Sequence, residues 1–361
     1  MSAPALITIA DYEARAREKM DPGAFDYYAG GAGDERTLAA NRAALDALWL
    51  RPRVLVDVAT IDLSLTLFGD RLSMPVLVAP AAFHRLAHPE GECATARAAA
   101  AAGTAMVVST VASRTFEEVA ATGPGVRWFQ LYFYRDRALT EAMVRRAESA
   151  GYRALVLTAD TPRLGQRERD LRNQFQLPSD VRIVNFEAQH PLERGVGPGA
   201  GHNLQNYAQQ MLNPSLTWTD VEWLRGITKM PVLVNGVLTA EDARLAVRHG
   251  AAGIVVSNHG GRQLDGAIAA AAALPEVVDA AGGKIPVLMD GGVRRGIDVL
   301  RALALGASAV QVGRPCLWGL AVDGEAGVRR VLEILREELI AAMTLSGRPS
   351  LASIDPSLLV R

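Results

Sequence analysis

Eight short apolar runs, each rich in valine, leucine and isoleucine, constrain the fold of this chain more than any other feature of its sequence. They occupy residues 74–80, 105–110, 127–132, 154–160, 230–236, 253–258, 285–292 and 308–314. Such runs are typical of parallel strands, because helices cover both faces of a parallel sheet. Helical patterns separate the runs, for example in residues 239–250, which have a threonine N-cap, an acidic first turn and a closing glycine. This alternation predicts parallel βαβ units.

Eight such units predict an α/β protein with a closed (β/α)8 TIM barrel, and a doubly wound parallel sheet is the alternative. The 361 residues are predicted to form a single domain, residues 1–361, because α/β barrels of more than roughly 200 residues commonly fold as one unit. Within it we expect an N-terminal helical extension over residues 1–70, the barrel over 71–345 and a C-terminal tail over 346–361. Residues 22–45 are predicted to form two short helices with a glycine-rich joint.

The connection after the fourth run, about residues 161–229, is longer than a normal βα connection. Its middle, residues 193–205, is rich in glycine and shows no hydrophobic periodicity. A stretch of this kind is usually a lid or a mobile loop. The sequence therefore predicts a long loop after strand four of the barrel.

Charge and cysteine usage exclude several classes of function. The chain has 38 basic and 39 acidic residues, and no basic run is dense enough to indicate a nucleic acid partner. Cys93 and Cys316 show neither metal-ligand spacing nor a disulfide framework, so we expect no metal site and a reducing compartment. The N-terminal segment lacks a signal-peptide core, and no apolar run reaches the ~20 residues that span a bilayer. These features predict a cytoplasmic protein without a membrane segment.

Polar residues follow nearly every apolar run, and the carboxyl ends of strands are where barrels carry their chemistry. After the seventh and eighth runs, the segments DGGVRRG and VGRP supply glycine amides, arginines and the start of a helix. Barrels often bind a phosphate group at this corner. We therefore predict a phosphate site there, and two tight turns with solvated arginines are the alternative interpretation. The candidate residues are Asp290, Gly291, Gly292, Arg294, Gly313 and Arg314.

The sixth run continues into the segment VVSNHGGRQLDG, residues 255–266, which places His259 three residues before Arg262. An arginine can bind a carboxylate through two parallel hydrogen bonds, and a histidine can accept a proton at neutral pH. This turn therefore suits a substrate that carries a carboxylate and loses a proton. A lone histidine is more often structural, but a His-Gly-Gly-Arg turn at a barrel strand end favours a catalytic role.

The segment SNHGGRQLDG, residues 257–266, resembles the active-site signature of the FMN-dependent L-2-hydroxy-acid oxidising family, which includes glycolate oxidase, lactate oxidase and mandelate dehydrogenase. Further matching segments are DYYAGGAGDERTLAANR, FQLYFYRDR, LTADTPRLGQRERDLRN and DGGVRRGIDVLRALALGA, so the resemblance covers nearly the whole chain. It implies that the protein oxidises an L-2-hydroxy acid to the 2-oxo acid with FMN as cofactor. It also implies reoxidation by oxygen, which gives hydrogen peroxide, or by another electron acceptor, and a homotetramer or octamer.

The resemblance implies roles for individual residues. His259 would be the catalytic base, Asp160 would stabilise its protonated form, and Tyr132 would hydrogen-bond the substrate hydroxyl. The substrate carboxylate would be held by Tyr27 and Arg262, and Arg167 would be the second arginine on the substrate side. FMN would be bound by Ala79, Pro80, Ala81, Ser109, Gln130, Thr158, Asn235, Ser257, Asp290, Gly291, Gly292, Arg294, Gly313 and Arg314.

Asn235 departs from the family pattern, because the family has a lysine at this position, beside flavin N1 and the C2 carbonyl. Reduction places negative charge on this part of the flavin, and a cation offsets that charge. Asparagine donates a hydrogen bond but carries no charge, so we expect a lower flavin potential. The alternative function is therefore an FMN-binding protein with weak or altered catalysis.

Val111 stands where glycolate oxidases have a tryptophan against the substrate side chain. Valine is much smaller, which favours a 2-hydroxy acid larger than glycolate, such as an aromatic one. Phe83 and Tyr134 are candidates to line the enlarged space, and ordinary barrel packing explains either residue equally well.

A different FMN barrel enzyme, such as a type 2 isopentenyl-diphosphate isomerase, is a further alternative. The combination that argues against it consists of Tyr27, Tyr132, His259 and Arg262. This set of side chains fits a small hydroxy acid.

Overall fold

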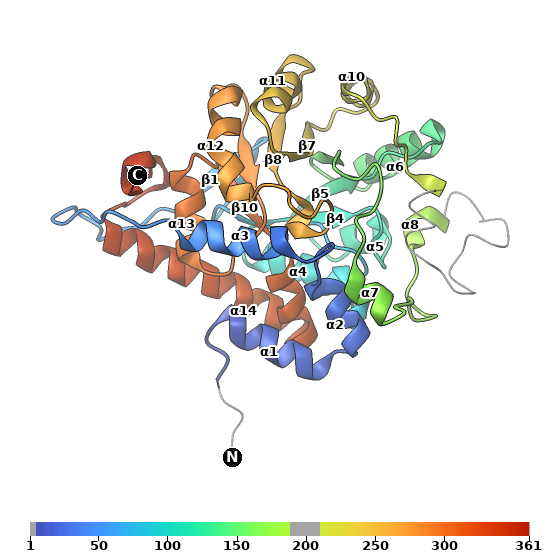
Figure 1. The fold of residues 1–361 in the computed structure, drawn as a ribbon, viewed down its shortest axis with the longest axis horizontal. Helices are drawn as coiled ribbons and strands as arrows, with labels where there is room; N and C mark the ends of the chain where they lie inside the picture. The colour runs from blue at the N-terminus through green and yellow to red at the C-terminus, as the bar shows by residue number, and fades with distance from the viewer. Residues whose placement is uncertain (1–4, 188–209, 361) are drawn as a thin grey trace.

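The computed structural model describes residues 5–187 and 210–360. Eight parallel strands form a closed barrel in the order β10-β3-β4-β5-β6-β7-β8-β9, and helices surround it (Figure 1). The strands are β3 (Val76–Val78), β4 (Ala105–Ser109), β5 (Val126–Leu131), β6 (Leu155–Thr158), β7 (Val232–Val237), β8 (Gly253–Val256), β9 (Val287–Met289) and β10 (Ala309–Val312). Each strand overlaps one of the eight apolar runs. Because β10 pairs with β3, the sheet closes on itself, which confirms the barrel and excludes the doubly wound sheet.

Helices alternate with the strands as the sequence predicts. The helices of this outer ring are α4 (Glu92–Ala101), α5 (Phe116–Ala120), α6 (Arg137–Ser149), α10 (Trp218–Ile227), α11 (Ala240–Arg248), α12 (Ala270–Ala281), α13 (Gly296–Ala304) and α14 (Arg314–Ser346). The backbone of α14 is not helical at Asp323 and Gly324, so α14 consists of two helices joined by a kink. A Cβ atom at Gly319 would lie 2.5 Å from the carbonyl oxygen of Gly327, so the close approach of the two halves requires glycine.

Three helices precede the barrel, α1 (Ile9–Lys19), α2 (Pro22–Ala29) and α3 (Arg36–Asp46). The last two confirm the pair of short helices predicted for residues 22–45. The side chain of Thr8 accepts a hydrogen bond from the backbone N–H of Asp11, which caps the start of α1. Helix α1 packs along α14, and α2 contacts the short helix α7 (Glu168–Arg172). The N-terminal helices therefore extend to the mouth of the barrel.

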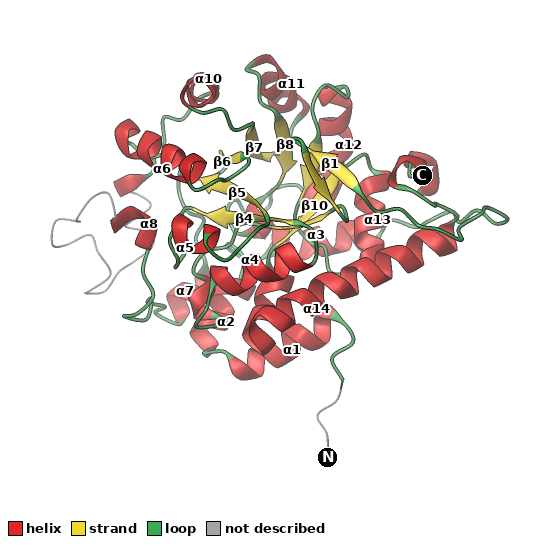
Figure 2. Ribbon diagram, turned by 180° about the vertical axis from the view of Figure 1, so that it is seen from behind, coloured by secondary structure: helices red, strands yellow, loops and turns green. Residues whose placement is uncertain are grey.

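A short antiparallel hairpin, β1 (Leu65–Leu67) and β2 (Asp70–Leu72), is an element that the sequence analysis does not predict. Its leucines join the cluster of side chains that fills the barrel interior. The ring of Phe68, in the hairpin turn, contacts the ring of Trp128 at a centroid distance of 5.4 Å. The hairpin therefore closes the amino-terminal end of the barrel, and Figure 2 shows β1 beside the strands from behind.

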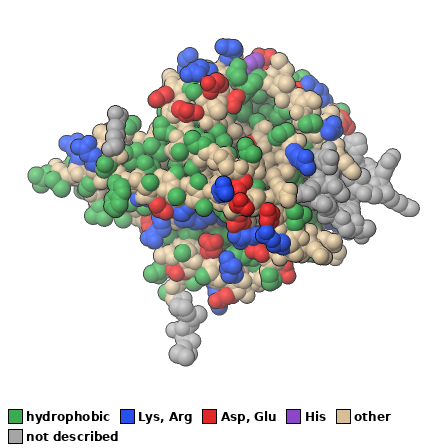
Figure 3. All heavy atoms as spheres, in the orientation of Figure 1, with side chains coloured by type: hydrophobic (Ala, Val, Ile, Leu, Met, Phe, Trp, Pro, Cys, Tyr) green, Lys and Arg blue, Asp and Glu red, His purple; other side chains and the backbone are tan. Residues whose placement is uncertain are grey.

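The long connection after β6 contains α7 and α8 (Val184–Glu187). The predicted lid or mobile loop, residues 193–205, lies outside the described residues. In the part of the chain that the structure describes, no helix is long and apolar enough to cross a membrane. Basic and acidic side chains are interspersed over the face in Figure 3, which matches the net charge of −1.

The inward-facing positions of the barrel change from apolar to polar along seven of the eight strands. The exception is β3, whose run has alanine at position 79. Side chains alternate between the two faces of a strand, so residues two positions apart both point inward. The deeper inward positions are all apolar, namely Leu77, Val107, Trp128, Val156, Leu233, Val255, Leu288 and Ala309. Two residues further along, the layer consists of Ala79, Ser109, Gln130, Thr158, Asn235, Ser257, Asp290 and Gln311. This second set, which we call the polar layer, forms the floor of a cavity at the carboxyl ends of the strands.

Candidate active site

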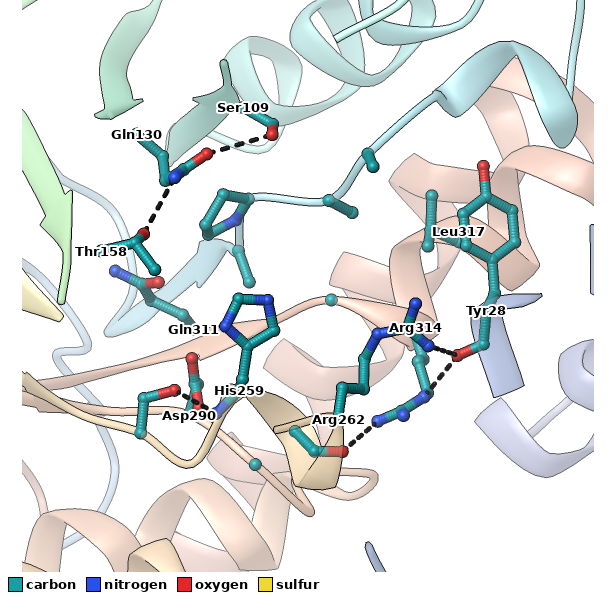
Figure 4. Close-up of a pocket in the computed structure, with 18 of the residues that line it drawn as sticks. Tyr28, Ser109, Gln130, Thr158, His259, Arg262, Asp290, Gln311, Arg314 and Leu317 are labelled. Carbon is teal, nitrogen blue, oxygen red and sulfur yellow. Dashed lines mark hydrogen bonds between the residues drawn. The ribbon is translucent and has the colours of Figure 1, made fainter. Parts of the chain in front are cut away.

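The cavity above the polar layer brings the predicted site residues together (Figure 4). Those that line it are Tyr27, Ala79, Pro80, Ala81, Ser109, Gln130, Tyr132, Thr158, Arg167, Asn235, Ser257, His259, Arg262, Asp290, Gly291, Gly292, Arg294, Gly313 and Arg314. Asp160 does not line it but contacts His259, which does. These residues come from the ends of all eight strands, from helix α2 and from the N-cap of α7, so distant parts of the sequence build one site.

His259 and Asp160 form the pair that the sequence analysis proposes as base and partner. Nδ1 of His259 lies 3.1 Å from Oδ1 of Asp160, and both side chains are largely buried. The backbone of His259 has a left-handed conformation with φ of +58°, and its N–H donates to Oγ of Ser257 at 3.0 Å. Because Asp160 engages Nδ1, Nε2 is the ring nitrogen that remains to accept a proton.

Two neighbouring residues fix the position of Asp160. Nε2 of Gln263 donates to the Asp160 carbonyl oxygen at 2.8 Å. Gly236, at the end of β7, has φ of +106°, and a Cβ atom there would lie 2.6 Å from Cβ of Asp160. A side chain at position 236 would therefore displace the carboxylate from His259.

Arg262 and Arg167 are two cations that both lie close to the ring of Tyr27. The guanidinium carbons of Arg262 and Arg167 lie 5.1 Å and 5.8 Å from the centre of the Tyr27 ring. Burial, reinforced by the nearby Arg167, lowers the pKa of Arg262 to about 10, so it remains charged at neutral pH. Within the described residues, neither arginine forms an ion pair with a carboxylate. Two unpaired cations that line a cavity favour an anionic ligand.

Tyr132 lines the same cavity as these arginines and the polar layer. Its backbone N–H donates to Oγ1 of Thr110 at 3.1 Å, which anchors the end of β5. Burial raises the pKa of Tyr132 above its ordinary value. The phenol therefore stays protonated at neutral pH and is a hydrogen-bond donor.

Asp265, three residues after Arg262, has a structural role. Its carboxylate accepts hydrogen bonds from the backbone N–H groups of Asp34 at 3.0 Å and Thr37 at 2.9 Å. These are N–H groups at the start of α3, whose N-cap residue makes no side-chain capping bond of its own. Asp265 therefore caps a helix more than two hundred residues earlier in the sequence and ties the catalytic turn to the N-terminal extension.

The predicted phosphate corner is an anion site at the start of α14. Its N-cap, Gly313, supplies no side-chain capping bond, Pro315 has no N–H, and Cys316 and Leu317 donate to the Gly313 carbonyl oxygen, so the N–H of Arg314 is the first-turn amide left for an anion. Arg294 and Arg314 are half-buried there, desolvation lowers the pKa of both, and within the described residues neither forms an ion pair. The start of α13 is different, because Asp298 already accepts from the N–H groups of Arg294 and Arg295. The anion site therefore belongs to α14.

Arg314 also joins the corner to the N-terminal extension. Its guanidinium donates to the carbonyl oxygens of Tyr28 at 2.7 Å, Gly30 at 2.9 Å and Gly260 at 3.0 Å. Arg262 donates to the carbonyl oxygens of Tyr27 at 2.6 Å and Gly30 at 3.0 Å. The C-terminal end of α2 is thus held by both arginines, which is favourable because the end of a helix carries partial negative charge.

The two halves of the polar layer differ in how well their polar atoms are satisfied. On one side, Oγ of Ser109 donates to Oε1 of Gln130 at 3.0 Å, and Nε2 of Gln130 donates to Oγ1 of Thr158 at 2.9 Å. On the other side, Oδ1 of Asn235 and Oδ1 of Asp290 are buried without a partner among the described residues. Burial raises the pKa of Asp290 to about 6. Buried polar atoms without partners favour a polar ligand above this floor.

Two side chains with polar groups in the site, Tyr28 and Gln311, escape the sequence analysis. Tyr28 lines the cavity, and its hydroxyl donates to the carbonyl oxygen of Phe83 at 2.6 Å. Gln311 is a buried member of the polar layer. A lone polar residue inside an otherwise apolar strand run is a signal for Gln311, whereas no such signal marks Tyr28. Of the two side chains proposed to line the enlarged substrate space, Phe83 lines the cavity, and Tyr134 is buried outside it.

The anion site and the polar floor together suit FMN. The phosphate fits the start of α14 with its two half-buried arginines, and the ring and ribityl chain offer hydrogen-bond donors and acceptors to the unpartnered atoms of the floor. The fold and the site thus place the protein in the class of barrel enzymes that hold a phosphorylated cofactor over the strand ends. The sequence model of the FMN-dependent dehydrogenase family matches residues 16–361, and the chain belongs to this family.

Several known proteins are similar to the chain over nearly its full length. Glycolate oxidase 1 of Oryza sativa subsp. indica is 54% identical over 349 residues, which cover 97% of this chain and 94% of the relative. L-lactate oxidase of Nostoc sp. is 53% identical over 357 residues, which cover 98% of each chain. A crystal structure of mandelate oxidase has a TM-score of 0.91 at 46% identity, and the match covers 99% of this chain and 98% of that one.

Replacing Asn235 with lysine is expected to raise the midpoint potential of bound FMN. Hydrogen bonds to charged groups are stronger than neutral ones by about 1–2 kcal/mol, which corresponds to about 20–40 mV for a two-electron couple. Asn235 is buried at the end of β7, where it lines the cavity. Spectroscopic titration with a reference dye measures the potential. Asn235→Gln, which lengthens the side chain without adding charge, is the control, and equal potentials in all three proteins would rule out this role of charge.

Proposed function

We propose that the protein oxidises an L-2-hydroxy acid to the 2-oxo acid, with FMN as its cofactor. The observation that carries this proposal is the turn that places His259 and Arg262 on the wall of one cavity. The similarity to glycolate, L-lactate and mandelate oxidases supports the same reaction class. It also favours catalysis over the alternative of a flavin-binding protein with weak activity.

Different residues of the site bind the substrate and accept its proton. The substrate carboxylate is held by Tyr27, Arg167 and Arg262, which supply a phenol and two guanidinium groups. The hydroxyl accepts a hydrogen bond from Tyr132. Nε2 of His259 accepts a proton from the substrate, and Asp160 stabilises the imidazolium through Nδ1.

The cofactor is held by the residues of the strand ends and supplies the electron chemistry. FMN, when bound, accepts the two electrons that leave the substrate. The side chains of Arg294 and Arg314 and the backbone N–H of Arg314 hold the phosphate, and the polar layer supports the remainder. The layers of packed side chains below this floor exclude water from that side of the cavity.

We also propose oxygen as the electron acceptor, with hydrogen peroxide as the second product, because the similar proteins are oxidases by name. In keeping with the sequence analysis, we propose one domain over residues 1–361, a cytoplasmic location and a homotetramer or octamer.

The reaction is tested most directly by adding 2-hydroxy acids to the purified yellow protein without oxygen. We expect the visible absorbance of the oxidised flavin to bleach when an L-2-hydroxy acid is added. It should return when air is admitted. A peroxide assay in air then identifies the acceptor. Absorbance that no 2-hydroxy acid bleaches would contradict the proposal and favour a flavin-binding role.

The substrate side of the cavity has an apolar wall. The lining residues of this wall are Phe83, Val111, Leu164 and Leu212. No large aromatic side chain stands at position 111, so the space suits a substrate with a bulky apolar side chain. We therefore propose a 2-hydroxy acid larger than glycolate, of the aromatic or branched type.

Replacing Val111 with tryptophan is expected to shift the preference from mandelate towards glycolate. Each methylene that no longer fits an apolar pocket changes kcat/KM by about 10–200-fold, so a change of at least tenfold in the ratio of the two kcat/KM values is expected. Val111→Leu, with an intermediate volume, serves as the graded control. The proposal on substrate size fails if the wild-type enzyme already prefers glycolate.

A further inference from the structure

Gln311 is the polar residue of the floor to which no role has been given above. It lies on β10, is only 2% exposed and lines the cavity. Its Nε2 is buried and has no hydrogen-bond partner among the described residues. Leucine or methionine would fill the position without leaving an amide unsatisfied, so the amide indicates a polar ligand.

The surroundings of Gln311 also lack partners for it. Register pairs Val310 of β10 with Met289 of β9, so the next residues, Gln311 and Asp290, are neighbours across the two strands. No hydrogen bond joins them in the described structure, and Oδ1 of Asp290 is itself buried without a partner. Oδ1 of Asn235, on β7, is likewise buried and has no hydrogen-bond partner among the described residues. The arc of the floor from β7 to β10 therefore depends on a ligand, whereas Ser109, Gln130 and Thr158 satisfy one another.

The charge of the floor adds a second argument. Among the eight residues of the polar layer none is a cation, and Asp290 is the one that can carry a charge. A floor of this kind disfavours negative charge on a bound ring unless neutral donors offset it. The donors of this arc that contain an N–H group are the carboxamides of Asn235 and Gln311.

We propose that Gln311 is a cofactor-binding residue whose carboxamide hydrogen-bonds FMN from β10. It acts with Asn235, so that two neutral amides on different strands take the place of a cation beneath the cofactor. The acceptors it meets are the carbonyl oxygens, ring nitrogens or ribityl hydroxyls of FMN, all of which accept hydrogen bonds.

The test compares Gln311→Met, which keeps the length of the side chain but removes the amide, with the wild-type holoprotein. Val310→Ala is the matched control, because it changes the neighbouring position of β10 that packs outward against the helices. Apo-protein is titrated with FMN and followed by flavin fluorescence, and the midpoint potential is measured with a reference dye. For Gln311→Met we expect a five- to tenfold higher Kd for FMN, roughly the loss of one hydrogen bond, and a lower potential. For Val310→Ala we expect a lower Tm and a Kd within about twofold of wild type.

Gln311→Glu supplies a second measurement that does not depend on the methionine variant. It keeps length and shape but introduces a carboxylate, so the potential is expected to fall below that of the wild type. Unchanged FMN affinity and potential in Gln311→Met, or an unchanged potential in Gln311→Glu, would overturn the proposal. Binding of FMN by the wild-type protein is the internal reference, so failure of this inference is distinguishable from failure of the cofactor assignment.

Discussion

Replacing His259 with glutamine is expected to lower kcat by about 10²–10⁴-fold, which is the usual contribution of a positioned general base. Glutamine can still hydrogen-bond a substrate, but it cannot accept a proton at neutral pH. The loss should fall on kcat rather than on FMN binding, because the residues of the anion site lie after β9 and β10 and at the start of α14. Anaerobic flavin reduction in a stopped-flow instrument measures this step directly.

His249 provides a matched control for this prediction. It is also a histidine whose Nδ1 lies 2.9 Å from a carboxylate, that of Glu222, but it lies outside the cavity. His249→Gln should therefore leave the rate of flavin reduction within about twofold of wild type, since this side chain, although it is no more exposed than that of His259, does not line the cavity. If His259→Gln reduced its flavin as fast as His249→Gln does, His259 would not be the base.

Replacing Arg262 with methionine is expected to lower kcat/KM by about 10²–10³-fold. Removing one partner of a buried charge-assisted hydrogen bond costs about 2–5 kcal/mol, and each 1.4 kcal/mol is a factor of ten. Arg262 is buried beside Tyr27, and within the described residues it forms no ion pair that would compete with a substrate carboxylate. Steady-state kinetics with the preferred 2-hydroxy acid measure the effect.

Binding of a carboxylate that cannot react separates recognition from chemistry in this variant. The inhibition constant of oxalate should rise together with KM in Arg262→Met. Arg262→Lys should lose less affinity for oxalate because it keeps the charge. It should still bind oxalate more weakly than the wild type, because a lysine lacks the planar fork of donors. Arg262 also donates to the carbonyl oxygens of Tyr27 and Gly30, so FMN content and Tm are measured for each variant. Unchanged oxalate inhibition in a folded, FMN-loaded Arg262→Met would contradict the assignment.

The barrel is predictable from the sequence because its strands are buried on both faces. A strand such as β8, Gly253–Val256, must be apolar at every position, and this gives an unbroken run that a surface strand would not show. The site residues that follow the runs could be predicted for the same reason. Each unbroken apolar run ends where its strand leaves the barrel interior, and polar side chains begin there. The β1–β2 hairpin escapes prediction because its strands have three residues each, too few for a pattern of alternation.

Other features depend on tertiary contacts that the local sequence does not express. Asp265 caps α3 across a separation of 228–231 residues, so its role appears only when the two segments are brought together. Gln311 lies within an apolar run rather than after it, so its side chain is identified as part of the floor only through the alternation of inward and outward positions. Tyr134 lies two residues beyond Tyr132, yet it is buried outside the cavity, because the chain has left β5 there and pairs with Leu212 in an isolated bridge, so strand alternation no longer sets the direction of the side chain.

Arg262 and Arg314, at the mouth of the barrel, both donate to carbonyl oxygens at the end of α2. The segment before residue 71 is thus part of the active site, because it supplies Tyr27 and the carbonyl oxygens that position the two arginines. A fragment beginning at the first barrel strand would keep all eight strands and yet release Arg262 and Arg314 to solvent and lose Tyr27 outright. Anyone who transplants this chemistry onto a minimal barrel must therefore also supply a helix end for the two guanidinium groups to hold.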